Sequence, residues 1–178
     1  MKMLLSELRA LIVEAMDPMR LLQVDHNVCL LITDDNDQER SRGGMKFVYH
    51  GEWDAYEVVE VWATDPRAAV ALFGACLVAK KRLLPDTSLS PAAKAIIKRW
   101  YSRHKNDGSV LPGPEREIVE DDPAFNSIYT VPKGFESPVP IEEPTKSYDF
   151  QNAIRDAHGV GFRAAYDDQQ KSGWNRKR

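Results

Sequence analysis

The spacing of hydrophobic and polar positions changes along the first part of the chain. Apolar residues recur three and four positions apart over residues 3–16, which predicts an amphipathic helix. Short runs rich in valine, isoleucine and aromatic residues follow at 27–33, 45–50 and 55–63, and they predict three strands. Turn residues at 51–54 predict that the second and third of these strands form a hairpin.

The polar run 34–44 has no regular apolar spacing, so it is expected to form a loop between the first two strands. Farther along, Asp65-Pro66 and Ser90-Pro91 each combine an N-cap residue with a proline suited to the first helical position. We therefore expect one helix that runs to about Leu83 and a second that runs to about Lys105.

These elements predict an α+β fold. Because the connections between the three strands are short, the strands should form a small antiparallel sheet, with helices packed on one face. This core domain is expected to span residues 1–106. A helix over 55–63 is the alternative to the third strand, because Glu57 and Glu60 would otherwise fall on opposite faces of that strand.

The pattern changes after Asn106. Seven of the eleven prolines lie between residues 107 and 144, which disfavours long helices and strands there. The same segment keeps large apolar residues, which disordered linkers lack. We expect residues 107–148 to form an extended, acidic, proline-rich arm that lies in a groove of its own domain or of a neighbour. Its expected anchors are Ile118, Phe125, Ile128, Tyr129, Phe135 and Ile141.

The last part of the chain, residues 149–178, is expected to hold short helical segments and a basic tail. Residues 148–157 and 162–170 have helical character, and His158 to Gly161 separates them. Nowhere does the sequence hold an uncharged apolar run long enough for a membrane span, so no membrane association is expected.

The amino-acid composition and the distribution of charge both bear on which partners the chain is expected to have. Apolar residues make up 43% of the 178 residues and the formal net charge is −3, which by itself favours no partner. The charges are unevenly spread, however. Residues 107–149 hold ten acidic and three basic side chains, whereas residues 150–178 hold six basic and three acidic ones. Such asymmetry indicates interactions between charged segments or with charged partners.

The strongest cluster of charge is basic and lies between residues 80 and 105, where Asp86 is the single acid. Trp100 and Tyr101 fall within it. Cations with aromatic residues are typical of nucleic-acid surfaces. The alternatives are that the aromatic residues belong to the core, and that the cations face an acidic protein segment such as the arm. The basic residues are Lys80, Lys81, Arg82, Lys94, Lys98, Arg99, Arg103 and Lys105.

Motifs for catalysis or cofactor binding are absent from the sequence, and no metal site or cofactor is predicted. The best candidates for acid–base chemistry are Glu57, Glu60 and a histidine–carboxylate pair at His50 and Glu52. Two cysteines, in apolar runs, are expected to be buried free thiols in a reducing compartment.

The leading prediction is a non-catalytic, cytoplasmic protein that docks onto protein subunits, of the same or a different chain, through its arm. The order of elements is shared by many unrelated families, including small neck and tail-completion proteins of tailed phages, so a virion component formed in the cytoplasm is one version of this prediction. A nucleic-acid-binding or transcription-modulating protein that uses helices 65–105 is the alternative. A small enzyme with dispersed acid–base residues is the second alternative.

Overall fold

The computed structural model describes residues 18–35, 38–86, 89–117 and 121–142. The predicted helical segments 3–16, 148–157 and 162–170 lie outside these residues, and so does the predicted anchor Ile118.

An eight-stranded mixed sheet dominates the described fold, in the order β6-β7-β5-β4-β3-β2-β1-β8. The β4–β5 and β1–β8 pairs are parallel and the other pairs are antiparallel. The predicted three-stranded antiparallel sheet is therefore wrong. The strands are β1 (Met19–Asp25), β2 (Val28–Asp35), β3 (Gln38–His50), β4 (Ala55–Ala63), β5 (Arg82–Leu84), β6 (Val110–Pro112), β7 (Ser127–Thr130) and β8 (Ile141–Glu142).

The region predicted as a loop, residues 34–44, is mostly the paired end of the β2–β3 ribbon. The pairing runs from Val28↔Lys46 to Asp35↔Gln38. Backbone pairing needs no apolar pattern, so the polar sequence gave no sign of it. Gly43 sits in this ribbon because a Cβ there would lie 3.0 Å from the Trp62 carbonyl oxygen and 3.2 Å from Leu72.

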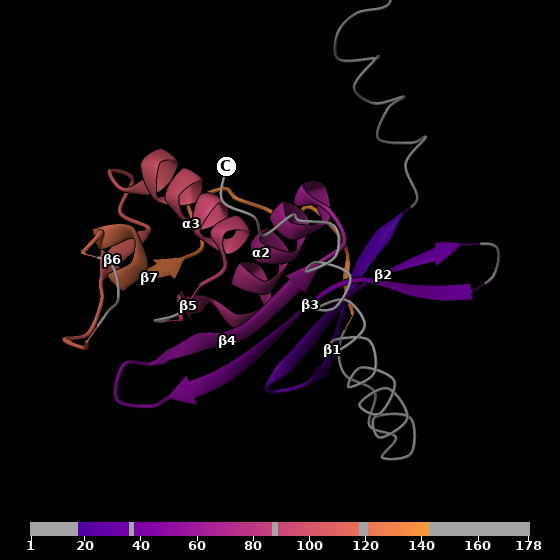
Figure 1. The fold of residues 1–178 in the computed structure, drawn as a ribbon, viewed down its shortest axis with the longest axis horizontal. Helices are drawn as coiled ribbons and strands as arrows, with labels where there is room; N and C mark the ends of the chain where they lie inside the picture. The colour runs from indigo at the N-terminus through magenta and orange to yellow at the C-terminus, as the bar shows by residue number, and fades with distance from the viewer. Residues whose placement is uncertain (1–17, 36–37, 87–88, 118–120, 143–178) are drawn as a thin grey trace, which may run out of the picture.

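Two α-helices lie in the described part of the chain, both on one face of the sheet (Figure 1), which we call the near face. Both predicted starts are confirmed. Asp65 accepts from the Ala68 amide at α2 (Pro66–Lys80), and Ser90 accepts from the Ala93 amide at α3 (Pro91–His104). The described residues also include a short 3₁₀ helix, η1 (Pro123–Asn126).

The first helix ends earlier than predicted. Lys81 adopts a positive φ of 72° and its amide donates to the Leu77 carbonyl, which ends α2. The chain then turns back into the sheet as β5, which pairs with β4 at Tyr56↔Leu83. Three residues are too few for a strand to show a readable period, so the sequence predicts helix up to about Leu83 and no strand at β5.

The segment predicted as an arm supplies strands to both edges of the sheet. Its strands β6 and β7 lie beyond β5, and β8 lies beyond β1. Between them, residues 131–140 cross the helices, and we call this segment the strap. The ring centroid of Phe135 lies 5.2 Å from that of Trp100 on α3, and its ring also approaches Gly74 of α2. The described arm thus lies on its own domain.

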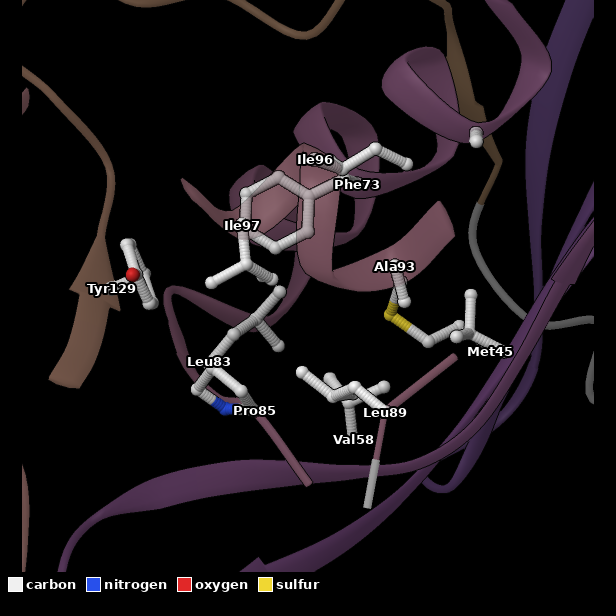
Figure 2. A pocket seen from close by; sticks show the side chains of 12 residues that line it. Met45, Val58, Phe73, Leu83, Pro85, Leu89, Ala93, Ile96, Ile97 and Tyr129 are labelled. Carbon is white, nitrogen blue, oxygen red and sulfur yellow. The ribbon is translucent and has the colours of Figure 1, made fainter. Parts of the chain in front are cut away.

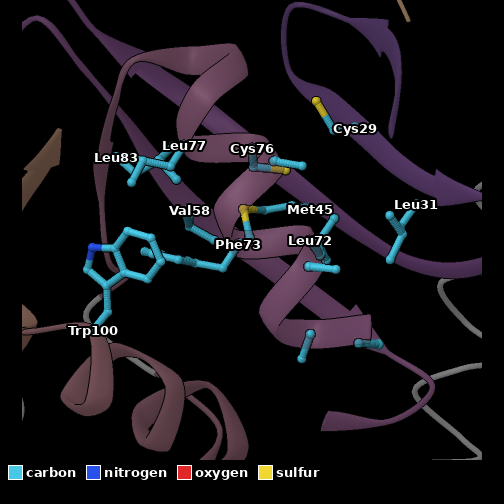
Figure 3. Close-up of a cluster of buried hydrophobic side chains, with 14 of the residues drawn as sticks. Cys29, Leu31, Met45, Val58, Leu72, Phe73, Cys76, Leu77, Leu83 and Trp100 are labelled. Carbon is cyan, nitrogen blue, oxygen red and sulfur yellow. The ribbon is translucent and has the colours of Figure 1, made fainter. Parts of the chain in front are cut away.

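The main core fills the space between the near face and α2 (Figure 3). Leu72, Phe73 and Leu77 of α2 meet Met45 and Val58 of the sheet there. The opposite face of the sheet, which we call the far face, carries two smaller clusters. One contains Leu22, Val24, Leu30, Ile32 and Trp62, and the other contains Ala55, Leu84 and Ile128.

Candidate functional site

The outer side of α3 carries exposed cations on four residues, Lys98, Arg99, Arg103 and Lys105, which we call the α3 cationic surface. The apolar side of the same helix buries Ile97 and Trp100. Trp100 is only 8% exposed and its ring packs on Phe73, while Tyr101 is half-buried. The aromatic residues therefore belong to the core, and stacking on nucleic-acid bases is not available to Trp100 in this structure.

The remaining predicted basic residues do not join this surface. Lys80 is buried, its Nζ donates to the His26 carbonyl at 3.0 Å, and it lies 5.0 Å from the Tyr56 ring centroid. Arg82 donates from Nε to the Asp54 carbonyl at 2.6 Å, at the turn between β3 and β4. Lys81 is exposed at the end of α2 and Lys94 is half-buried near the start of α3. A basic stretch of sequence thus divides into structural and exposed cations.

Neutralisation of these cations by the acidic arm is limited. Lys98 Nζ lies 3.9 Å from Asp122 Oδ2, a loose and exposed pair. Within the described residues, Arg99, Arg103 and Lys105 form no ion pair. The α3 cationic surface is therefore largely open to solvent in this structure.

An open groove of about 480 Å³ adjoins the end of α3. Tyr101 and Lys105 line it from α3 and the residue after it, β6 lines a second side, and Asp121 and Asp122, just before η1, also line it. Asp122 is already engaged, because its Oδ1 accepts from the Ala124 amide at 2.9 Å. The groove combines one cation with two carboxylates, so its charge selects no ligand class.

The expected anchors of the arm are mostly used inside the chain. Phe125 is 4% exposed, Ile128 is 6% exposed and Tyr129 is fully buried. The Tyr129 hydroxyl donates to the Ala124 carbonyl at 2.5 Å, and burial raises the pKa of this phenol far above its ordinary value. Phe135 and Ile141 are half-buried against the same core. Partner docking through the three buried anchors would require the fold to open.

The strongest constellation of charged groups joins His50, Glu57 and Arg116 on the far face. His50 Nε2 lies 2.8 Å from Glu57 Oε2, and Arg116 Nη1 lies 3.5 Å from Glu57 Oε1. Arg116 also donates to the carbonyls of Pro85 and Phe125, and burial lowers the pKa of its guanidinium. The group therefore ties the segment after β6 to β4 and β5.

The acid–base chemistry open to this group is limited. The ring of His50 stacks on Trp53 with centroids 4.4 Å apart, and its Nδ1 lies 3.9 Å from Glu52 Oε1. No described serine, threonine or cysteine side chain is hydrogen-bonded to His50. The predicted pair of His50 with Glu52 is present at 3.9 Å, but Glu57 is the closer carboxylate at 2.8 Å. Arg116 was missed, because it lies far from Glu57 in the sequence.

Glu60 stands apart from this group. Val59 is an extra residue in β4, since Lys46 pairs with Glu60 and Phe47 with Val58. This bulge places Glu57 and Glu60 on the same face, contrary to the expected opposite faces. Glu60 Oε2 lies 2.8 Å from Lys46 Nζ, an exposed pair across the two strands, whereas Glu57 pairs with His50 and Arg116.

A small cavity of about 40 Å³ lies between α3 and the near face (Figure 2). Met45, Phe73, Leu83 and Ile97 are among its apolar walls, and Tyr129 brings the nearest hydroxyl. This volume suits one or two water molecules at most. Substrate chemistry is not expected in it.

Three further findings bear on function. Cys29 and Cys76 are buried and free, as expected, and burial raises the pKa of the Cys76 thiol well above its ordinary value. The described residues contain no group of three or more His, Cys, Asp or Glu placed to hold a metal ion. No helix in the described ranges is long and apolar enough to cross a membrane.

Comparison with protein-family models, with curated proteins and with solved structures finds no match.

Proposed function

We propose that this chain is a non-catalytic protein that assembles with other protein subunits, and that it docks through the end of the β3–β4 hairpin. The observation that supports this proposal is the placement of exposed apolar side chains. Val48 is 45% exposed, Tyr49 49% and Val59 41%. These three residues lie on one hairpin, and Val70 on α2 is the other large apolar side chain of comparable exposure among the described residues.

The hairpin offers apolar groups on two sides. Val48 pairs with Glu57 and shares the far face with it, whereas its neighbour Tyr49 pairs with Tyr56 on the near face. Tyr49 is held in place, because its hydroxyl donates to Asp54 Oδ1 at 2.8 Å. Fixed, exposed aromatic and aliphatic side chains are typical of protein-binding surfaces.

This proposal changes the site of docking, not the class of function. The arm was the expected docking element, but Phe125, Ile128 and Tyr129 are buried in its own domain. The version of the prediction that names a phage-type virion component stays a prediction. It was drawn from the expected order of elements, and the observed sheet has eight strands in place of the expected three. A cytoplasmic location is part of the proposal, and the two free thiols support it.

The test compares two serine variants. V48S/V59S removes two apolar groups from the hairpin, and V70S makes one such substitution at a similarly exposed site on α2. Tagged chains would be isolated from their native cells, and bound proteins quantified by mass spectrometry. A protein recovered at fixed ratio with wild type and V70S should fall about tenfold or more with V48S/V59S, since burying each valine contributes about 1.5 kcal/mol.

Two results would contradict the proposal. Equal recovery of the partner with V48S/V59S and wild type would move the docking surface elsewhere. Recovery of nucleic acid in place of any protein would favour the second candidate.

The second candidate is nucleic-acid binding by the α3 cationic surface. It is favoured by the exposed Arg99, Arg103 and Lys105, which have no acidic partner among the described residues. R99E/R103E should abolish binding to a duplex or single-stranded probe, whereas K81E/K133E, the same charge change at exposed sites elsewhere, should weaken it much less. Binding should also fall steeply, by about 10²-fold for roughly four phosphate contacts, between about 50 and 200 mM salt. An affinity that does not change with salt concentration would exclude this candidate.

A further inference from the structure

Two exposed valines lie on the far face of the β3–β4 hairpin. They are Val48 on β3, which is 45% exposed, and Val59 on β4, which is 41% exposed. Val48 lies on this face because Phe47, the residue before it, is buried in the main core on the near face. Val58 and Val61 also contact the main core, so the bulge turns both residues between them toward the far face. Both α2 and α3 lie on the near face (Figure 1), so no described helix covers the two exposed valines.

Charged and polar side chains border these valines on the same face. Along β3, the valine lies between Lys46 and His50, and along β4 the other valine lies between Glu57 and Glu60. Lys46 Nζ lies 2.8 Å from Glu60 Oε2, and the two side chains are 35% and 47% exposed. His50 Nε2 lies 2.8 Å from Glu57 Oε2. In both pairs the basic group is on β3 and the carboxylate is on β4, so the hairpin presents a basic strand beside an acidic strand.

This surface is complementary to itself. When two copies pack face to face around a two-fold axis parallel to the strands, β3 of one copy lies over β4 of the other. Lys46 of each copy then faces Glu60 of the other copy, and four charges alternate in sign at the border of the valines. An axis across the strands would lay β3 over β3 and bring the two basic strands together. The distribution of charge therefore favours a second copy of the chain in one orientation.

We propose that the far face of the β3–β4 hairpin binds a second copy of this chain in a two-fold symmetric dimer. Val48 and Val59 of both copies form its apolar centre, and the pairs of Lys46 with Glu60 form its polar border. The inference rests on the docking through the hairpin proposed above, and it names the partner. Because the apolar centre is small, the dimer should be reversible, with a dissociation constant in the micromolar range.

Sedimentation equilibrium of the full chain, over roughly 1 to 200 µM, measures this dimer. The wild type should change from monomer to dimer within this range. V48S/V59S should raise the dissociation constant about tenfold or more, because it removes the apolar centre from both copies. V70S is the control, since Val70 is 44% exposed but lies on α2, and its dissociation constant should equal that of the wild type.

Exchange of charge tests the orientation of the two copies. K46E and E60K should each weaken self-association about tenfold, because like charges then meet between the copies. An equal mixture of the two variants, one of them labelled with nitrogen-15, should recover the wild-type affinity as a heterodimer that native mass spectrometry detects. In this mixture an acidic pair of side chains faces a basic pair. A role of the ion pair within its own hairpin alone would not be rescued by mixing.

Three results would each overturn the inference. They are a wild-type chain that stays monomeric over the whole range, equal association of V48S/V59S and wild type, and a mixture of K46E and E60K that stays monomeric. The proposed function has a separate test. Recovery of a different protein that depends on Val48 and Val59 would still support docking through the hairpin, with a partner other than a second copy.

Discussion

The helices α2 and α3 begin with the same signal and end in different surroundings. Each has a capping side chain followed by proline. Ten of the fifteen residues of α2 are buried, but only Ile97 and Trp100 are buried among the fourteen of α3. The reason is that α2 lies between the sheet and the strap, whereas α3 has solvent on its outer side. The composition of a helix thus reports how many of its sides are covered.

The largest expected effect is on the inner side of α2. F73A should lower the free energy of unfolding by about 3–5 kcal/mol, because Phe73 is 5% exposed and packs on Trp100 and Tyr129. I96A on α3, where the side chain is half-buried, should cost less than half of that. Urea denaturation gives both values. Equal losses would mean that the two helices are covered alike.

The outer side of α2 should be the next most sensitive position. A Cβ at Gly74 would already lie 3.2 Å from Phe135 and 3.3 Å from Pro138 of the strap. G74L should therefore destabilise the protein by about 1–3 kcal/mol through overpacking. A95L, at an exposed position of α3, should change stability by less than about 0.5 kcal/mol. A harmless G74L would show that the strap does not lie on α2.

The two N-caps should differ in their response to pH. Burial acts to raise the pKa of Asp65, but the Ala68 amide, the Thr64 hydroxyl and the charge of Arg42 together hold it below its ordinary value. The stability from Asp65 is therefore present above the pKa of the unfolded state, near 4, and is lost as the pH falls through the lower folded pKa. The cap at Ser90 uses an uncharged hydroxyl, so its contribution to stability should not depend on pH in this range.

D65A should consequently cost about 1 kcal/mol at pH 7 and less at pH 3, whereas S90A should cost about 1 kcal/mol at both pH values. Thermal unfolding at the two pH values measures the difference. If D65A costs the same stability at both pH values, the charge of Asp65 does not contribute to the cap.

The smallest effect is expected on the outside of α3. R99A and K98A should each change the unfolding free energy by less than about 0.5 kcal/mol, since Arg99 is exposed and the pair of Lys98 and Asp122 is exposed and 3.9 Å long. Chemical denaturation checks this. A loss above 1 kcal/mol would indicate that the α3 cationic surface stabilises the fold and is not free for a partner.

The sequence predicted those elements whose signals are local. The strand at 55–63 and the starts of both helices are confirmed, because side-chain alternation and N-cap residues act over a few positions. The fold class failed where partners are distant. The strand β1 was not predicted, and β6, β7 and β8 have two to four residues, too few for a period. Their pairing depends on a sheet that the rest of the chain builds.

The candidate sites divide in the same way. The sequence identified the exposed cations of α3, because they lie off the apolar stripe that faces the core. The join between Glu57 and Arg116 could not be predicted, because only the return of the chain beside β5 brings them together. The apolar residues of the arm were recognised as anchors, but the sequence left open whether they bind their own domain or a neighbour.

Native-state hydrogen exchange on the full chain tests the central claim most directly, namely that the strap and its strands belong to one cooperative fold with α2. The amides that report on the arm are Leu21, which donates to the Pro140 carbonyl, and Thr130, which donates to the Ser109 carbonyl. The amide of Lys81, which donates to the Leu77 carbonyl, reports on the end of α2. The account predicts that Leu21 and Thr130 open with free energies within about 1 kcal/mol of the amides in the middle of α2. Opening of both at about 3 kcal/mol or more below α2 would show that the arm detaches on its own, and would contradict the claim.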